Sequence, residues 1–344
     1  MKETQAIVTR LLNQPALPAV LATLVATRGS SYRRPGARLL VEADGQRTGA
    51  ISGGCLEEDL LVRARRVRTT GEAEKAVYDT TAEEDLVWGV GLGCHGVVEV
   101  LLEPILSLPD WVPPLAANLD RYLPTRLAVR HGGSEPRTWG TRLAGESSTT
   151  GDPHDFVQEV SPSVHLAVFG AGEDAISLVR LAAMMGWRVT VADPRPALVT
   201  VSRFPDATAR FSGPAEQLVR LVDPDPAASA VIMTHHYVHD LPLLRELLAR
   251  PLSYLGLLGP RRRAEKLLGD LAAAGQPISS EQRVRLHAPV GLDLGAEAPE
   301  QVALAIVAEV QAVKTGRDAR PLRMRTLPIH QAPAPGPTLP ANSH

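Results

Sequence analysis

The chain has little cysteine and almost no net charge. Its 344 residues include two cysteines, Cys55 and Cys94, which are too few for a disulfide framework. A reducing compartment is the simplest setting for such a chain, so we expect a cytoplasmic protein. The formal net charge of −2 gives no broad basic field, and binding to bulk nucleic acid is therefore not expected.

The chain also lacks a hydrophobic run long enough to cross a membrane. The uncharged stretch between Arg10 and Arg28 contains Pro15 and Pro18. Its apolar part is far shorter than the roughly 20 residues that a spanning helix needs. We therefore expect neither an export signal nor a membrane contact. The second half of the stretch, 20–27, predicts a buried strand because it is apolar and β-branched.

The length of the chain suits two domains, and its pattern changes along the sequence. The changes predict an N-terminal α/β domain over 1–110, a connector over 111–162, a Rossmann-like domain over 163–316 and a disordered tail over 317–344. The tail is expected to be disordered because its last 24 residues contain six prolines and show no apolar periodicity.

The C-terminal half alternates strand and helix patterns, which is typical of a doubly wound parallel sheet. Strands are expected at 164–169, 187–192, 229–233 and 252–258, and helices at 175–185 and 299–315. The predicted fold class is therefore α/β, with a C-terminal Rossmann-like doubly wound parallel sheet and a separate N-terminal α/β domain.

The N-terminal domain shows a strong β-hairpin signal at Asp44-Gly45, between expected strands at 37–41 and 48–52. A helix is expected to begin at Cys55. Three acidic residues follow this cysteine, and acidic side chains suit the positive end of a helix.

Residues 169–175 fit the phosphate-binding pattern G-x-G-x-x-A between an expected strand and an expected helix. Gly170 permits the tight turn, Gly172 lets a phosphate approach the backbone, and free N–H groups at the helix start favour an anion. Asp193, at the end of the next expected strand, is placed to bind a ribose or a similar diol. Alternatively, the glycines only shape a turn in a domain that binds nothing. Glu173, a carboxylate beside the expected anion, favours that alternative.

Both cysteines lie beside glycines: Cys55 follows Gly53 and Gly54, and Cys94 lies within the glycine-rich segment 91–96. Glycine lets a backbone approach a ligand closely, and a cysteine offers a nucleophilic or metal-binding sulfur. Burial of each thiol as a small hydrophobic group is the competing interpretation. Two sulfurs and one histidine do not close a structural zinc site, so no directly bound metal is predicted.

Other polar residues follow expected strand ends or lie in basic loops. Arg33, in a loop rich in serine and arginine, and Arg261, after an expected strand, suit an anion; a solvated basic turn is the competing interpretation for each. His235 and Asp240 follow another strand, at the edge where doubly wound sheets bind ligands. We assign these four residues to a cofactor site together with Gly53, Gly54 and the Gly170 turn.

Several segments together resemble one known family, the xanthine dehydrogenase accessory proteins, XdhC/CoxI. The segments are ATRGSSYRRPGAR at 26–38, GAISGGCLEE at 49–58, GLGCHG at 91–96, the Gly170 turn, 234–240, 256–262 and 289–295. The similarity covers most of residues 15–312, and the combination is far more specific than any single segment.

The resemblance implies a chaperone that binds molybdenum cofactor, protects it, helps to sulfurate it and delivers it to a xanthine dehydrogenase-type molybdenum hydroxylase. It implies an accessory protein more than a catalyst, a cysteine desulfurase as the sulfur source, and a homodimer. The cofactor would be molybdopterin or its dinucleotide form. Cys55 and Cys94 would contact sulfur or molybdenum, so that any molybdenum is held through the cofactor.

Two other functions fit the residues. An NAD(P)-dependent oxidoreductase is one, because the Rossmann pattern is shared and Asp193 suits NAD. Against it, His235 and Asp240 form the only clear candidate acid–base pair. A protein-interaction scaffold with a vestigial Rossmann domain is the other, and Glu173 is its best support.

Overall fold

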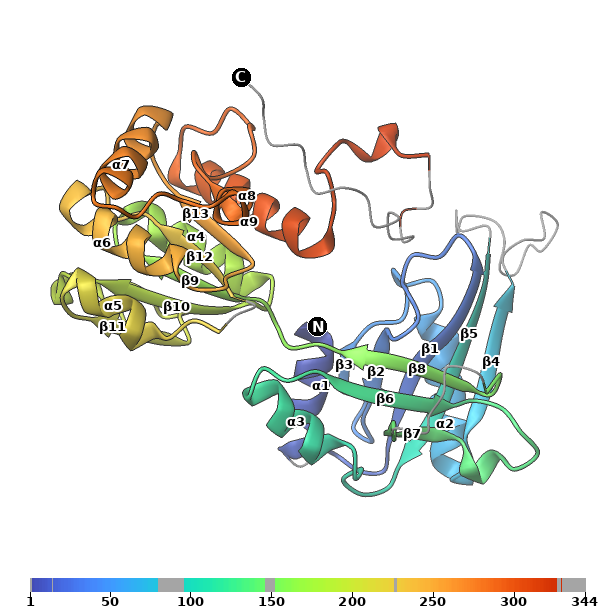
Figure 1. Cartoon of the computed structure of the whole chain (residues 1–344). Helices are drawn as coiled ribbons and strands as arrows, with labels where there is room; N and C mark the ends of the chain where they lie inside the picture. Colours follow the sequence, from blue (N-terminus) through green and yellow to red (C-terminus); the bar gives the residue numbers. More distant parts are fainter. Residues whose placement is uncertain are drawn as a thin grey trace. The chain divides into compact units, whose positions relative to one another are not determined.

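The structure is a computed structural model of the chain, and it describes residues 2–13, 15–79, 96–145, 152–225, 228–326 and 329. It divides into two compact units, Met1–Ser163 (unit 1) and Val164–His344 (unit 2), shown in Figure 1. Cys94 and most of the tail predicted to be disordered lie outside the described residues. Within the described residues, no helix has both the length and the apolar character needed to cross a bilayer.

Unit 1 is built on a five-stranded antiparallel sheet in the order β3-β2-β1-β5-β4. Its strands are β1 (Ala19–Gly29), β2 (Arg38–Val41), β3 (Arg47–Gly49), β4 (Glu74–Asp79) and β5 (Gly96–Ile105). The expected hairpin joins β2 to β3, with Leu40 opposite Thr48. Gly45 has a φ of 88° in its turn, a conformation that glycine adopts without steric cost.

The two faces of this sheet bury different helices. The helices of unit 1 are α1 (Lys2–Leu12), α2 (Glu57–Thr70) and α3 (Val112–Asp120). Val20 and Ala22 of β1 belong to a core with α2, whereas Ala19 and Leu21 belong to a core with α1 and α3. Successive side chains of a strand point to opposite faces, so both faces of β1 are covered.

The region expected to be a connector forms α3 and a second antiparallel sheet, in the order β7-β6-β8. Its strands are β6 (Thr125–Arg130), β7 (Gly140–Leu143) and β8 (Asp155–Val160). Leu127 and Val160 join the core that contains α1, and Val129 packs with Leu101 of β5. This region therefore differs from the expected connector, since it is part of unit 1, which ends at Ser163.

Unit 2 contains a six-stranded parallel sheet in the order β11-β10-β9-β12-β13-β14. Its strands are β9 (His165–Phe169), β10 (Arg188–Asp193), β11 (Ala209–Ser212), β12 (Ser229–Ile232), β13 (Tyr254–Leu257) and β14 (Leu286–His287). Numbered within the unit, this is the order 3-2-1-4-5-6 of a Rossmann sheet, so the predicted fold class is confirmed. The strand order reverses between β9 and β12, and such sheets bind ligands beyond the strand ends at that point.

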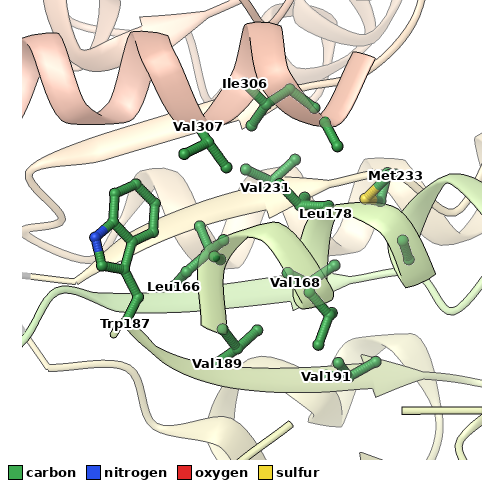
Figure 2. Close-up of a cluster of buried hydrophobic side chains, with 14 of the residues drawn as sticks. Leu166, Val168, Leu178, Trp187, Val189, Val191, Val231, Met233, Ile306 and Val307 are labelled. Carbon is green, nitrogen blue, oxygen red and sulfur yellow. The ribbon is translucent and has the colours of Figure 1, made fainter. Parts of the chain in front are cut away.

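Helices cover both faces of this sheet. They are α4 (Glu173–Met184), α5 (Ala215–Val222), α6 (Tyr237–Leu248), α7 (Arg261–Ala273), α8 (Ser280–Arg285) and α9 (Pro299–Thr315). Leu166 and Val168 of β9 pack in a core with α4 and α9 (Figure 2), whereas Ala167 and Phe169 pack in a core with α5, α6 and α7. A strand buried on both faces is almost entirely apolar, which is why β9 was recognisable in the sequence. The last helix, α9, has the predicted bounds.

Candidate functional site

The Gly170 turn joins the carboxyl end of β9 to α4, as the sequence predicts. Gly170 has a φ of 128°, and a Cβ atom there would lie 2.4 Å from the carbonyl oxygen of Met233. Gly172 is the N-cap residue of α4, and no side chain of the described residues caps this helix. A Cβ atom on Gly172 would come no closer than 4.0 Å to His235. The fold therefore requires a glycine at 170, whereas Gly172 leaves space in front of the free N–H groups of the helix.

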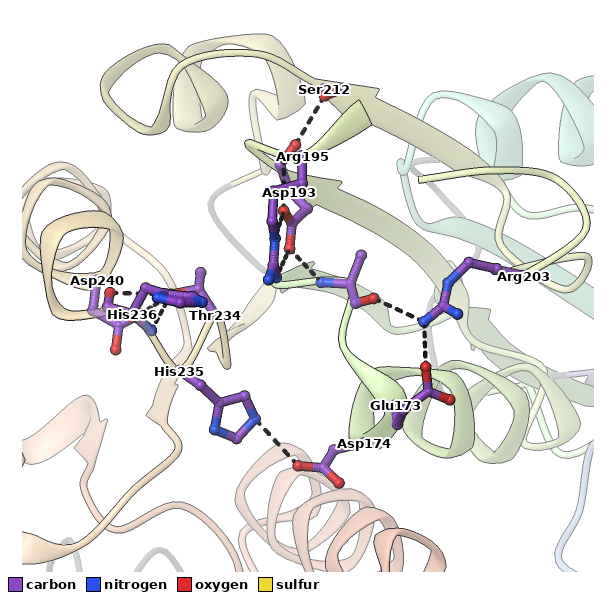
Figure 3. A network of polar contacts seen from close by, with 11 residues as sticks. Glu173, Asp174, Asp193, Arg195, Arg203, Ser212, Thr234, His235, His236 and Asp240 are labelled. Atoms are coloured by element: carbon purple, nitrogen blue, oxygen red, sulfur yellow. Dashed lines mark hydrogen bonds and ion pairs between the residues drawn. The ribbon is translucent and has the colours of Figure 1, made fainter. Parts of the chain in front are cut away.

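Asp193, at the end of β10, is fully buried and holds the turn together (Figure 3). Its Oδ2 accepts the N–H of Ala171 at 2.7 Å, and Arg195 donates to Oδ1 through Nε at 2.9 Å and to Oδ2 through Nη2 at 2.8 Å. The sequence places Asp193 to bind a ribose, and the structure corrects this assignment. Both carboxylate oxygens are already bound within the protein, so Asp193 positions the turn instead.

The pKa of Asp193 makes this contact sensitive to pH. Burial raises the pKa, but the bonds from Arg195 and from the Ala171 N–H outweigh burial and lower it. A depressed folded-state pKa gives stability that is present above the unfolded value of about 3.9 and is lost as the pH falls through the folded pKa.

Asp193→Asn is expected to lower the free energy of unfolding by about 2–4 kcal/mol near neutral pH, because the amide donor opposes donors of Arg195 and Ala171. Urea unfolding of both proteins near pH 7 and near pH 3 measures this effect, and we expect the difference to shrink at acid pH. Equal unfolding free energies near neutral pH would show that the turn does not depend on this carboxylate.

Two carboxylates stand at the start of α4, and each has a partner (Figure 3). Arg203 donates through Nη2 to Glu173 Oε1 at 2.8 Å and to the carbonyl oxygen of Ala171 at 3.2 Å. His235 Nε2 lies 3.2 Å from Asp174 Oδ2. Acidic side chains at a helix start would repel a bound anion, and the Arg203 guanidinium compensates the charge of Glu173. Glu173, the carboxylate that favoured a vestigial Rossmann domain, is thus already paired with Arg203.

A second network follows β12, across the switch point from the turn (Figure 3). Asp240 is 1% exposed; its Oδ1 accepts the hydroxyl of Thr234, and its Oδ2 accepts Nε and Nη2 of Arg263 at 3.1 and 2.6 Å. Arg263 Nη1 also donates to the carbonyl oxygen of His235 at 3.3 Å. The sequence assigned Asp240 to the cofactor site. The structure shows instead a buried carboxylate whose oxygens are bound by Thr234 and Arg263, so Asp240 positions this loop.

His235 is the residue of this loop that lies beside the turn. Its φ of 61° is in the left-handed region, which residues with a side chain rarely adopt. Its side chain is 51% exposed and lies beside Gly172. Such strained positions cluster at functional sites, because the surrounding contacts hold them in place. The assignment of His235 to a cofactor site stays a prediction.

Two arginines that the sequence motifs do not single out, Arg203 and Arg263, make these contacts, whereas Arg261 makes none of them. Arg203 comes from the loop before β11 and binds a residue 30 positions away, a contact with no local sequence signal. In the Arg261–Arg263 run, Arg263 joins the network, whereas Arg261 is an exposed first residue of α7. Helix phase separates Arg263 from Arg261, since Arg263 lies one turn before the buried Leu267 on α7; the anion contact of Arg261 stays a prediction.

Cys55 lies in the turn before α2 and is exposed, so it does not pack as a buried hydrophobic group. The helix begins two residues later than predicted, at Glu57. Ser52 shapes the turn, because its Oγ accepts the N–H groups of Gly54 and Leu56 at 3.1 and 3.2 Å and donates to Glu57. Burial raises the pKa of Glu57, but the two bonds from Ser52 together with the backbone N–H groups of Leu56 and Glu57 outweigh burial and lower the pKa.

A small pocket lies beside Cys55 and is also lined by Ser31, Tyr32 and Arg33. Its volume of about 30 Å³ has room for a water molecule and is too small for a pterin. Arg33, predicted to bind an anion, is paired here with Glu3 of α1, which takes up its charge.

The glycines before Cys55 leave the backbone open. Among the residues that the structure describes, a Cβ atom on Gly53 would contact only the ring of Tyr32, at 3.8 Å, and one on Gly54 would have nothing within 4 Å. A ligand can therefore approach the backbone beside the thiol. Cys94 lies outside the described residues, so its assignment to the site stays a prediction.

Comparison with known proteins bears on both sites. Residues 166–310 match the XdhC Rossmann domain, and residues 14–79 match the XdhC and CoxI family. A protein of Bacillus subtilis named as a probable xanthine dehydrogenase subunit is 35% identical over 313 residues, which span 85% of this chain and 92% of that relative. The chain belongs to the XdhC/CoxI family. The resemblance seen in the sequence is thereby confirmed.

Two further matches extend over most of this XdhC/CoxI protein. The molybdenum cofactor insertion chaperone PaoD of Escherichia coli is 28% identical over 298 residues, 86% of this chain and 83% of PaoD. A crystal structure described as a xanthine dehydrogenase from Bacillus halodurans is 31% identical, with a TM-score of 0.81, and the match covers 94% of this chain and 99% of that chain. The Gly170 turn and Cys55 fall in the two regions that match the XdhC/CoxI family separately.

Proposed function

We propose that this protein binds the molybdenum cofactor, protects it, helps to sulfurate it and delivers it to a xanthine dehydrogenase-type molybdenum hydroxylase. The names of two relatives support the proposal: one names a probable part of a xanthine dehydrogenase, and the other a molybdenum cofactor insertion chaperone. On this account the protein is an accessory protein, which holds and transfers the cofactor rather than turning over a substrate.

The observation that carries the proposal is the open, uncapped start of α4 at Gly172. Molybdopterin carries a phosphate, and its dinucleotide form carries a pyrophosphate. Free N–H groups and the positive end of the helix dipole bind such an anion. Arg203 compensates the nearest carboxylate, and His235 stands beside the open space. The residues present therefore fit the phosphate end of the cofactor.

Cys55 is proposed to contact the sulfur or molybdenum end of the cofactor, together with Cys94. Its thiol is exposed and lies in the turn before α2, where a ligand can reach the sulfur. When bound, the cofactor supplies the metal centre that the client hydroxylase needs. A cysteine desulfurase is the proposed source of the sulfur, and the protein is proposed to act as a cytoplasmic homodimer. Light scattering of the purified protein measures the oligomeric state.

An NAD(P)-dependent oxidoreductase is the second candidate, because the strand order of unit 2 is that of dinucleotide-binding domains. The bonds of Asp193 oppose it, since the acid that would bind the ribose hydroxyl groups of NAD has no free oxygen.

The test is to purify the full-length protein from cells that make the cofactor and to measure the fluorescent pterin released by oxidation. We expect roughly one pterin per chain, as for a single tight site. No retained pterin together with tight NADH binding would support the oxidoreductase. Binding of neither ligand would support a protein-interaction scaffold.

Cys55→Ser is expected to lower the delivery of sulfurated cofactor to an apo-hydroxylase by about tenfold or more, because a hydroxyl is a far weaker nucleophile and metal ligand than a thiolate. The activity recovered by the hydroxylase measures delivery. The matched control is Tyr32→Phe, which changes an exposed residue of the same pocket. This variant should deliver sulfurated cofactor as well as the wild type does. Undiminished delivery by Cys55→Ser would remove Cys55 from the account.

A further inference from the structure

A second pocket in unit 1 lies between the β2–β3 hairpin and α2. Its volume is about 270 Å³, just below the roughly 300–1,000 Å³ found for ligand pockets, so it suits only a small molecule. Part of its lining is apolar and includes Val20, Leu61 and Ala64. Neither Cys55 nor any residue of the Gly170 turn lines it.

The arginines of α2 divide between two faces of the helix. Arg63 and Arg66 are paired with Glu74, at 2.6 Å from Arg63 Nη1 and 2.8 Å from Arg66 Nε. Arg65 and Arg68 line the pocket instead. Across the part of the chain that the structure describes, Arg65 has no ion-pair partner, and Arg68 donates to two backbone carbonyl groups of the hairpin turn. The charges on the pocket face are thus left uncompensated.

Arg47, on β3, adds a third guanidinium to the pocket and has no ion-pair partner among the described residues. Two carboxylates also belong to the lining, Glu42 and Asp44. Arg10 binds Glu42 through two bonds, at 2.6 and 2.8 Å, so the charge of Glu42 is already compensated. Three arginines therefore face one carboxylate, Asp44, that has no ion-pair partner among the described residues and accepts the N–H of Gln46. Like charges three residues apart on a helix repel, and a bound anion relieves that repulsion.

From this geometry we infer that the pocket binds a small organic anion, a phosphate or carboxylate attached to a compact apolar group. Guanidinium groups bind both anions through paired, charge-assisted hydrogen bonds, and the apolar side chains bury the rest of the ligand. This ligand is separate from the cofactor proposed above, because the pocket shares no residue with either part of that site.

Calorimetric titration of the full-length protein with phenyl phosphate, benzoate and inorganic phosphate tests the inference. We expect phenyl phosphate or benzoate to bind about tenfold more tightly than inorganic phosphate, because the ring is buried against the apolar lining. Arg47→Gln/Arg65→Gln should weaken that binding by about tenfold or more, while Gly172→Ala should leave it unchanged. No binding of either organic anion at millimolar concentration would overturn the inference, as would a loss of binding in Gly172→Ala.

The matched control is Arg28→Gln/Arg137→Gln, which removes the same charge from arginines that are 75% and 83% exposed elsewhere in unit 1. It should bind normally; an equal loss would attribute the effect to overall charge and contradict the inference. Thermal unfolding checks that each variant folds. Arg47→Gln/Arg65→Gln should also retain as much pterin as the wild type. Loss of pterin in this variant would show that the pocket is part of the cofactor site, and would overturn the inference that it binds a separate ligand. If the protein binds the probe but retains no pterin, the result contradicts the proposed function and leaves the inference about the pocket intact.

Discussion

Gly172→Ala is expected to fold normally and to weaken binding of the molybdenum cofactor by about tenfold or more. A methyl group at this position meets nothing closer than His235 at 4.0 Å, and Gly172 has an ordinary φ of −70°, so the fold has room for it. The same methyl group stands in front of the N–H groups of α4, where the phosphate would approach the backbone. Pterin content after purification and the affinity for isolated cofactor measure the effect.

Gly269→Ala is the matched control for this variant. Gly269 lies within α7, in the same unit, and a Cβ atom there has nothing within 4 Å. This substitution should raise stability by about 0.5–1 kcal/mol through helix propensity and leave cofactor binding unchanged. If Gly172→Ala also bound the cofactor with unchanged affinity, the anion would have to lie elsewhere.

Gly170→Ala is expected to lower the free energy of unfolding by about 3–5 kcal/mol or to prevent folding of unit 2. A Cβ atom there would lie 2.4 Å from Met233 O, 2.5 Å from Met233 C and 2.8 Å from Thr234 N. These are backbone atoms that immediately follow the central strand β12, so they have no freedom to move aside. Urea unfolding measures the loss, and wild-type stability would show that the turn is looser than the structure has it.

Gly275→Ala separates the steric clash from backbone strain. Gly275 also has a positive φ, of 78°, but a Cβ atom there has nothing within 4 Å. This control should lose only about 1 kcal/mol, the cost of a left-handed residue with a side chain. A similar loss in both variants would attribute the effect at Gly170 to φ alone.

The phosphate turn could be predicted because all its signals are consecutive in the sequence. The apolar strand β9, the two glycines and the helix start lie within residues 165–184, and each has a local physical cause. The Rossmann order then follows from how alternating strands and helices connect. The hairpin at Asp44-Gly45 and the helix α9 could be predicted for the same reason, because their signals are also local in the sequence.

The contacts that decide the chemistry could not be predicted, because the sequence pattern does not show which side chains bond to one another. An aspartate at a strand end looks the same in sequence whether its oxygens are free or, as in Asp193, bound by Arg195 and Ala171. Likewise, nothing near Glu173 indicates that Arg203 pairs with it. The sheet β7-β6-β8 was missed because proline and glycine interrupt the sequence pattern around its strands, and its stability comes from packing against the rest of unit 1.

Native mass spectrometry of the full-length protein from cells that make the cofactor tests the central claim most directly. The account predicts a species whose mass exceeds that of the chain by one molybdenum cofactor, and a large loss of that species in Gly172→Ala but not in Gly269→Ala. A chain that carries NAD(P) instead, or that keeps the cofactor fully in Gly172→Ala, would contradict it.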